Sequence, residues 1–497
     1  MNWVADNIQS FAWFWPEALL ALGSIICLLL SAFYRKNVHI SFGIATVTLI
    51  AYICVGFYHL FFCDSGSSNL FVGHVKLDGL GQLLRVLFGF LGLITMHMGF
   101  VHQETRKNIH FEEIPSFLLV ITLGMSMMAW ANSLLMVFLA VEMVSIPSYI
   151  LVGIKKSDRF SAEAGIKYLL FGAFASGVML FGISYLYGIF GSGDFSILMS
   201  LLDSSFPMSS MGWIAMSLVC IFCGVAYKIA AFPSHMWCPD VYEAAPSPIT
   251  SFLSVGPKVA GVALILRILL LWGQNENLSM DQEIGQFLQR FLIFMSAITM
   301  TVGNLGALGQ VKMKRLMAYS SIAHAGYLLM GLACFSTQGF QASIIYFLIY
   351  FFMNVGCFYI IVAMENEYGS DDIQHFTIFA KHFPLVMALM TVFLFSLVGL
   401  PPFAGFIGKF YLFSVVIEQK MYGLAVIAAI NTAISLFYYA KILKTAYFSG
   451  EDTDIQPQTS FSWSISLMCI LMAVPTVFLL LQWKPLLTLV EKASASL

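Results

Sequence analysis

Long apolar runs dominate this chain and indicate its fold class. Stretches such as 134–154 and 344–363 are almost continuously apolar, whereas a membrane-spanning β-strand would alternate apolar and polar residues over about ten positions. A spanning helix needs about 20 mostly apolar residues, and by that measure the sequence predicts roughly fourteen of them. The first lies near 16–34 and the last near 461–482. We therefore expect an all-α polytopic membrane protein.

Two of the apolar runs are interrupted by proline and glycine. Near residue 233 the chain reads KIAAFPSHMWCPDVYEAAPSP, and near residue 401 it reads SLVGLPPFAGFIGKF. Proline removes a backbone donor and clashes with the preceding helical turn, so both helices should break. Broken helices survive in a membrane only when they are buried in protein or line a hydrated cavity. A pair of them in corresponding halves indicates a transporter built from internal repeats.

Four charged residues stand inside spans that are otherwise apolar: Glu142, Lys228, Lys258 and Lys409. Such residues cost roughly 2.5 to 3.5 kcal/mol on insertion scales and usually face a bundle interior, where they form ion or proton pathways. Lys228 and Lys409 adjoin the two breaks, and apolar residues on both sides argue against snorkelling to the interface. A lone buried carboxylate would be neutralised or paired, so we expect Glu142 to pair with Lys228. The pattern predicts a proton relay.

Other polar residues leave more than one interpretation open. His324, within SIAHAGYLL, either relays protons near neutral pH or is a satisfied core histidine. Asp240 and Glu243 follow the first break, where they either form a proton entrance or cap the next helix, and the cap is slightly favoured. Four further basic residues lie in or near spans and are left outside the site: Arg85, Lys167, Arg267 and Arg290. Arg267 is expected to pair structurally or to contact lipid.

Composition narrows the function further. Hydrophobic residues make up 59% of the chain and charged residues 10%, which does not describe a soluble domain. The net charge of −2 gives no reason to expect a nucleic-acid partner. Cys220 and Cys223 form an isolated CxxC within a helix, where thiols act as small hydrophobes. Neither nucleotide-binding loops nor iron–sulfur spacings are visible, so we expect no cofactor or metal in this chain.

Basic residues occur mainly in alternate loops, near positions 35, 106, 155, 312, 381 and 441. The opposite loops hold only Lys76 and Lys420, with Lys484 and Lys492 in the tail. By the positive-inside rule the basic loops face the cytoplasm. Both termini are then expected on the outer side, which requires an even number of spans.

Several long segments resemble the antiporter-like membrane subunits of respiratory complex I. They include VEMVSIPSYILVG, YKIAAFPSHMWCPDVYEAAPSPITSFLSVGPKVAG, GNLGALGQVKMKRLMAYSSIAHAGYLLMG and SLVGLPPFAGFIGKFYLF. The similarity extends from about residue 118 to residue 444, and the segments follow the same order. Within this family, PDVYEAAPSP is most similar to subunit N of NADH:quinone oxidoreductase, the counterpart of mitochondrial ND two.

The resemblance implies fourteen helices with two inverted five-helix repeats, each containing one proline-broken helix. On this basis we expect three N-terminal helices over 1–113, a first repeat over 114–272, a second over 284–448 and a last helix over 461–482.

The resemblance also implies roles for individual residues. It places Glu142, Lys228, Lys258 and Lys409 on helices five, seven, eight and twelve, as members of the proton relay. Protons would move from the cytoplasm outward, driven by redox chemistry in partner subunits.

The implied partners are the other membrane subunits of complex I, including neighbouring antiporter-like subunits, in the lipid bilayer of a bacterial inner membrane. FMN, iron–sulfur clusters and quinone are expected in partner subunits, and no redox centre is expected in this chain. The alternative is a subunit of a multisubunit cation/proton antiporter, which shares the fold. A membrane-embedded transferase is disfavoured, because only the loop from His235 to Glu243 offers an interfacial cluster of polar side chains.

Overall fold

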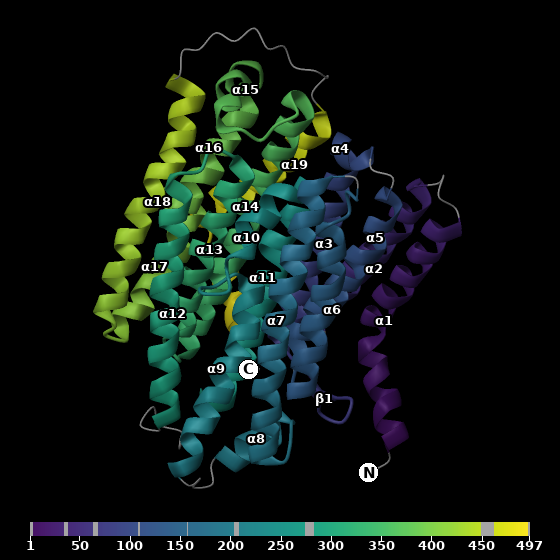
Figure 1. Ribbon diagram of the computed structural model, residues 1–497, viewed down its shortest axis with the longest axis vertical. Helices are drawn as coiled ribbons and strands as arrows, with labels where there is room; N and C mark the ends of the chain where they lie inside the picture. Colours follow the sequence, from purple (N-terminus) through teal and green to yellow (C-terminus); the bar gives the residue numbers. More distant parts are fainter. Residues whose placement is uncertain are drawn as a thin grey trace.

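The computed structural model is a bundle of long helices that run side by side (Figure 1). It describes residues 3–33, 38–62, 68–107, 110–156, 158–202, 208–273, 283–448 and 462–495. One end of the bundle carries α4 (Gln103–Arg106) and α15 (Phe376–His382), whereas the other carries β1 (Ser68–Leu70) and α8 (Phe195–Leu202) (Figure 1). The helices therefore have two well-separated ends, as spanning helices should.

The first part of the chain forms a flank of the bundle. It contains α1 (Trp3–Phe33), α2 (Val38–Phe62) and α3 (Gly79–Val101), with β1 paired antiparallel to β2 (Val75–Leu77). The chain continues through α4, the short 3-10 helix η1 (Phe111–Glu113), α5 (Ile114–Trp130), α6 (Leu134–Val152), α7 (Arg159–Phe190), α8, α9 (Met208–Ile229), α10 (Trp237–Ala244) and α11 (Ser247–Gly273).

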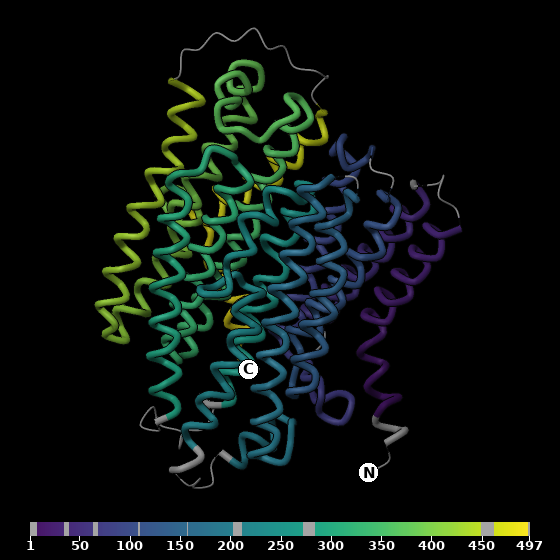
Figure 2. Tube along the Cα trace, in the orientation of Figure 1, coloured from purple at the N-terminus to yellow at the C-terminus, as the bar shows by residue number. Residues whose placement is uncertain are grey.

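The second part of the chain occupies the opposite flank, where the yellow-green trace near residues 422–448 is outermost (Figure 2). It contains α12 (Glu283–Leu308), α13 (Met313–Leu332), α14 (Thr337–Tyr368), the 3-10 helix η2 (Ile373–His375), α15, α16 (Pro384–Val398), α17 (Ala404–Glu418), α18 (Tyr422–Phe448), α19 (Trp463–Leu481) and α20 (Lys484–Ser494).

Twelve helices in the described part of the chain are long and apolar enough to cross a membrane. The all-α polytopic class is therefore confirmed. A count of fourteen further requires α13, which begins with charged residues, and the interrupted pair α16 and α17. That count and the inverted repeats stay predictions.

Both expected helix breaks are present. The first separates α9, which ends at Ile229, from α10, which begins at Trp237; Ala230 has a φ of 55° within it. The second separates α16 from α17, and here Gly399 has a φ of 90°. Each break interrupts the hydrogen-bond ladder and frees backbone carbonyls, as the proline chemistry predicts.

Two helices form the centre of the bundle. The most apolar windows of α11 and α14 are each 94% buried, whereas those of α7 and α19 are 33% and 28% buried. The outer helices leave much of their apolar surface exposed on the outside of the bundle. Polar side chains on α11 and α14 are consequently shielded from the outside of the bundle.

A buried polar network ties the N-terminal helices to this centre. Arg85 on α3 donates to Glu17 on α1 through Nε at 2.9 Å and Nη2 at 2.8 Å, and neither side chain is exposed. Arg85 also lies 4.4 Å from the ring of Trp130 on α5. Arg267 pairs with Asp78 in the same way and donates to the Ala129 carbonyl. The pairing expected for Arg267 is confirmed.

Candidate functional site

Three lysines of the predicted relay are buried in the bundle. Lys228, Lys258 and Lys409 expose 1%, 2% and 4% of their surface, and they lie on α9, α11 and α17. Among the described residues, no carboxylate lies within ion-pair distance of any of them. A buried ammonium without a counter-ion is costly unless water reaches it or its proton can leave. These three positions therefore favour proton exchange.

The direct pair expected between Glu142 and Lys228 is not formed. Glu142 is half-buried on α6 and accepts a hydrogen bond from the Ser176 hydroxyl on α7. Lys228 Nζ instead lies 5.7 Å from the ring centres of Tyr149 and Tyr227. Tyr149 is two turns from Glu142 along α6, about 10 Å in axial rise. An interaction between the charges of Glu142 and Lys228 would therefore act through space and not through a contact.

Glycine brings the first two lysines onto facing helix surfaces. A Cβ added at Gly261 on α11 would lie 2.6 Å from Ile229 Cγ2 and 3.6 Å from Lys228 Cβ. Lys258 is one turn before Gly261, so it lies next to this close approach of α9 and α11. A larger side chain at position 261 would separate the two lysine-bearing helices.

Helix α13 connects Lys258 with the second half of the chain. Lys258 Nζ donates to Ser321 Oγ on α13 at 2.6 Å and lies 5.6 Å from the Tyr242 ring. His324 follows Ser321 by one turn, and its Nδ1 is 2.6 Å from the Tyr346 hydroxyl. His324 is buried, and on α13 it lies between Ser321, which contacts Lys258, and Tyr327, whose ring faces Lys409. The structure thus places this histidine between the two lysines.

Lys409 is held by the second helix break. Its Nζ donates to the Val398 carbonyl at 2.8 Å and lies 4.6 Å from the Tyr327 ring on α13. Val398 is the last residue of α16, so its carbonyl has no partner within the helix. A cation is stabilised at a helix C-terminus by such free carbonyls.

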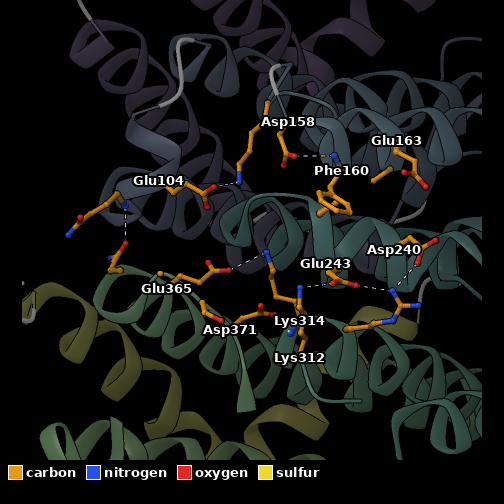
Figure 3. A pocket seen from close by; sticks show the side chains of 18 of the residues that line it. Glu104, Asp158, Phe160, Glu163, Asp240, Glu243, Lys312, Lys314, Glu365 and Asp371 are labelled. Atoms are coloured by element: carbon orange, nitrogen blue, oxygen red, sulfur yellow. Dashed lines mark hydrogen bonds and ion pairs between the residues drawn. The ribbon is translucent and has the colours of Figure 1, made fainter. Parts of the chain in front are cut away.

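Asp240 and Glu243 lie on α10 and belong to a charged cluster, and the helix cap and the proton entrance expected for them both stay predictions. Asp240 pairs with Lys167 and Arg315, and Glu243 pairs with Lys312 and Arg315 (Figure 3). These partners come from α7 and from the start of α13, which the local sequence does not reveal. Burial would raise the pKa of Asp240, but the bonds from Lys167 and the charge of Arg315 outweigh it and lower that pKa.

The charged cluster lines a cavity of about 740 Å³ at the end of the bundle that carries α4. Lys314 and Glu365 lie deep in its wall, with Lys314 Nζ 3.1 Å from Glu365 Oε1 (Figure 3). His102 Nε2 approaches Glu365 Oε2 at 3.1 Å. The sequence places Lys314 among the basic residues of the loop near position 312 and assigns no role to Glu365. Its position at the end of a long apolar run, in IIVAMENEYG, was the available signal.

Metal-binding clusters are not found in the described residues, where no group of three or more His, Cys, Asp or Glu side chains converges. Cys220 and Cys223 are both free thiols on α9. The residues that converge in the bundle are instead lysines, hydroxyls, tyrosines and one histidine.

Comparisons with known proteins identify the family. Residues 131–435 match the model of a family described as NADH:quinone oxidoreductase/Mrp antiporter, TM. The NADH-quinone oxidoreductase subunit N of Anaeromyxobacter sp. (strain Fw109-5) is 38% identical over 98% of this chain and 97% of its own length. The chain belongs to the NADH-quinone oxidoreductase subunit N family.

Solved structures agree with membership of the subunit N family. A chain of respiratory complex I from Thermus thermophilus, solved with bound aureothin, superposes with a TM-score of 0.78 at 26% identity, covering 96% of this chain and 99% of that one. A chain of the Mrp complex from Dietzia sp. DQ12-45-1b gives a TM-score of 0.83 at 20% identity, covering 99% and 97%. The second likeness shows a shared fold alone. The chain is thus an antiporter-like membrane subunit of complex I.

Proposed function

We propose that this chain translocates protons across the membrane as a subunit of NADH:quinone oxidoreductase. The relay comprises Glu142, Lys228, Lys258, His324 and Lys409. The observation that carries the proposal is that three buried lysines lack carboxylate partners among the described residues, and that α13 contacts two of them, Lys258 and Lys409. Buried structural cations are normally paired, whereas groups that take up and release protons must be able to lose their charge.

Electrostatic coupling between neighbouring members supplies a physical mechanism. Two unit charges about 7 Å apart at an effective dielectric near 20 interact by roughly 2.4 kcal/mol. Moving one charge against 100 mV costs about 2.3 kcal/mol. A change of charge at one member of the relay is therefore large enough to drive proton transfer at its neighbour. Movement of Glu142 relative to Lys228 would change the proton affinity of Lys228 and send its proton towards Lys258.

The later half of the relay follows from the contacts of α13. A proton that reaches Lys258 passes by way of Ser321 and His324 to Lys409. Release of the proton from Lys409 to the outer side returns the chain to its starting state. Because charges return to the same arrangement in each cycle, net transport requires energy from elsewhere. We place FMN, iron–sulfur clusters and quinone in partner subunits, and no redox centre in this chain.

The distribution of basic side chains supports an orientation. Six basic residues line the cavity at the α4 end of the bundle: Lys107, Lys155, Lys167, Lys312, Lys314 and Arg315. The positive-inside rule places this end in the cytoplasm. We therefore propose that protons enter at the charged cavity and that both termini lie on the outer side of a bacterial inner membrane. Other membrane subunits of the complex, including antiporter-like ones, cover the exposed apolar faces.

A cation/proton antiporter subunit is the second candidate, because the Mrp complex has the same fold. The whole-chain similarity to a protein named NADH-quinone oxidoreductase subunit N favours the first. Purification separates the two. Recovery together with flavin- and iron–sulfur-bearing subunits supports the respiratory complex, whereas recovery with small membrane subunits alone supports the antiporter.

The relay itself is tested with Lys228→Ala in native membranes, with NADH oxidation and proton translocation measured together. We expect proton translocation to be lost, because the first buried cation is removed. Lys228→Arg serves as the matched variant, since arginine keeps the charge but does not readily release a proton. A smaller defect with arginine would assign Lys228 an electrostatic role. Full translocation at normal turnover with Lys228→Ala would exclude the relay.

A further inference from the structure

A column of hydroxyl groups runs along α11 towards Lys258. Ser247, Ser251, Ser254 and Lys258 follow one another at spacings of four, three and four residues, which places them on one face of the helix. All three serines are fully buried. Eleven residues of α-helix span roughly 16 Å. The column thus extends along α11 from its first residue, Ser247, to Lys258 in the relay.

The upper end of the column opens at the charged cavity. Lys314, in the cavity wall, donates from Nζ to the Ala245 carbonyl at 3.2 Å. The Ser247 hydroxyl lies beside the Glu365 carboxylate without a well-formed hydrogen bond. Ser247 is therefore the first residue of α11 below the Lys314–Glu365 ion pair.

Several polar atoms along the column have no hydrogen-bond partner among the described residues. They are the hydroxyls of Ser247, Ser251, Tyr242 and Tyr350 and the Oδ1 atom of Asn354. Asn354 on α14 donates to Ser254 Oγ at 2.7 Å, so the column meets the seam between α11 and α14 at Ser254, whereas Tyr242 belongs to α10. Buried polar groups are nearly always hydrogen-bonded to protein or to water, and internal water binds where two or more such groups converge. Unpartnered groups in series are typical of a hydrated path.

We propose that protons reach Lys258 from the charged cavity along this hydroxyl column of α11, with the Lys314–Glu365 ion pair at its mouth. The proposal rests on the proposed proton translocation and adds a route of proton uptake that joins the relay at Lys258, beside the transfer from Lys228. A hydronium ion in the cavity donates one proton to the first water of the column. Each water or hydroxyl accepts one proton and passes on another, and the last delivers a proton to the neutral Lys258 amine. No other bond is made or broken.

The ion pair at the mouth has a positioning role. An unpaired Lys314 ammonium would repel an incoming proton, because like charges at close range in a partly buried site interact strongly. Glu365 offsets that charge, and His102 approaches the same carboxylate at 3.1 Å. Glu365 thereby keeps the mouth close to neutral without itself carrying the proton.

Two replacements of Ser251, isosteric with each other, test the route. Ser251→Thr and Ser251→Val add nearly the same volume, but only threonine keeps the hydroxyl. Thr250→Val is the matched control, because the neighbouring Thr250 is equally buried yet its hydroxyl bonds to the carbonyls of Tyr242, Ala245 and Pro246 and lies off the column. In the intact complex, we expect NADH-driven proton translocation to fall about tenfold with Ser251→Val, the effect of losing one buried hydrogen-bonding group on the path. Ser251→Thr and Thr250→Val should stay near the unmodified rate.

Equal translocation by Ser251→Val and Ser251→Thr would overturn the route. Lys228→Ala in the same membranes keeps this failure distinct from failure of the relay. If Lys228→Ala abolishes translocation while Ser251→Val does not, the relay stands and only the α11 route is wrong.

Water access can be measured independently of activity and of any packing defect in Ser251→Val. Ser251→Cys and Thr250→Cys are exposed to a methanethiosulfonate ethylammonium reagent from the cytoplasmic side, and the modified peptides are quantified by mass spectrometry. A thiol reacts as the thiolate and needs water contact, so we expect Ser251→Cys to react at least about tenfold faster than Thr250→Cys. Equal rates, or no reaction at position 251, would contradict a hydrated column.

Discussion

Lys409 and Val398 are joined across the second helix break by a hydrogen bond of 2.8 Å from Nζ to the backbone carbonyl. The bond depends on how the chain leaves α16. Gly399, the next residue, has a φ of 90°, and a Cβ added there would lie 2.8 Å from Lys409 Cδ. Backbone conformation and lysine position are therefore set by one glycine.

Gly399→Ala should impair proton translocation. The change strains the left-handed backbone by about 1 to 2 kcal/mol and pushes the Lys409 side chain from the Val398 carbonyl. Gly369→Ala is the control, because Gly369 has a φ of 68° but a Cβ there would meet nothing within 4 Å. Both variants should lose stability in thermal unfolding, whereas only Gly399→Ala should slow NADH-driven proton translocation. An equal slowing by both would show that backbone strain alone is responsible.

His324→Gln should slow proton translocation about tenfold or more, within the range expected when a group that transfers protons is lost. Glutamine keeps hydrogen-bonding capacity but does not titrate near neutral pH. Tyr346→Phe is the comparison, since it removes the partner of His324 Nδ1 and leaves the imidazole in place. We expect a smaller defect there. Normal translocation by His324→Gln would identify a core histidine.

Acid should loosen the charged cluster around Asp240 and Glu243. Burial opposes ionisation of both, but bonds from Lys167 to Asp240 and from Lys312 to Glu243, with the charge of Arg315, lower both pKa values below 3.8 and 4.5. A lowered pKa means that the stabilisation is complete above the ordinary values and is lost as pH falls through the folded-state values.

Thermal unfolding of the purified complex measured from pH 7 down to about pH 3 checks this. Asp240→Asn should be less stable at pH 7 and should show a weaker dependence on acid. Glu104→Gln is the control, because the Glu104 side chain is 61% exposed against 33% for Asp240 and exposed carboxylates contribute little through ion pairs. An unchanged acid profile for Asp240→Asn would assign the dependence to other groups.

The pair of Glu17 and Arg85 should matter for stability and not for transport. Glu17→Gln leaves a buried guanidinium without its counter-charge, at a cost of about 3 to 5 kcal/mol. The double variant Glu17→Leu/Arg85→Met should recover part of the loss, because no buried charge remains. Detergent resistance and unfolding temperature measure the effect. A loss of proton translocation per NADH in stably assembled Glu17→Gln complexes would instead indicate a transport role.

Local chemistry explains what the sequence predicted well. Both helix breaks were expected because proline and glycine act within a turn of their own position, and Pro233 and Gly399 lie within the observed interruptions. Burial of Lys228 and Lys409 was likewise readable from the apolar residues on either side. The serine spacing of α11 was also visible in the sequence but was not recognised.

The orientation of each helix within the packed bundle explains what the sequence did not predict. Glu142 was expected to contact Lys228, yet the rotation of α6 turns its carboxylate to Ser176 on α7. The sequence suggests for Asp240 a helix cap or a proton entrance, but it does not reveal its ion-pair partners, which are 73 and 75 residues away along the chain. Helical periodicity fixes which residues share a face, whereas the orientation of that face depends on packing between distant helices.

The Glu17–Arg85 pair has a consequence for how the chain is made. The two residues are 68 positions apart, and synthesis at 5 to 20 residues per second separates them by roughly 3 to 14 seconds. During that interval the α1 carboxylate waits in the membrane without its guanidinium. The polar contact between α1 and α3 therefore forms only after α3 has been synthesised, and a carboxylate buried before then would be neutralised.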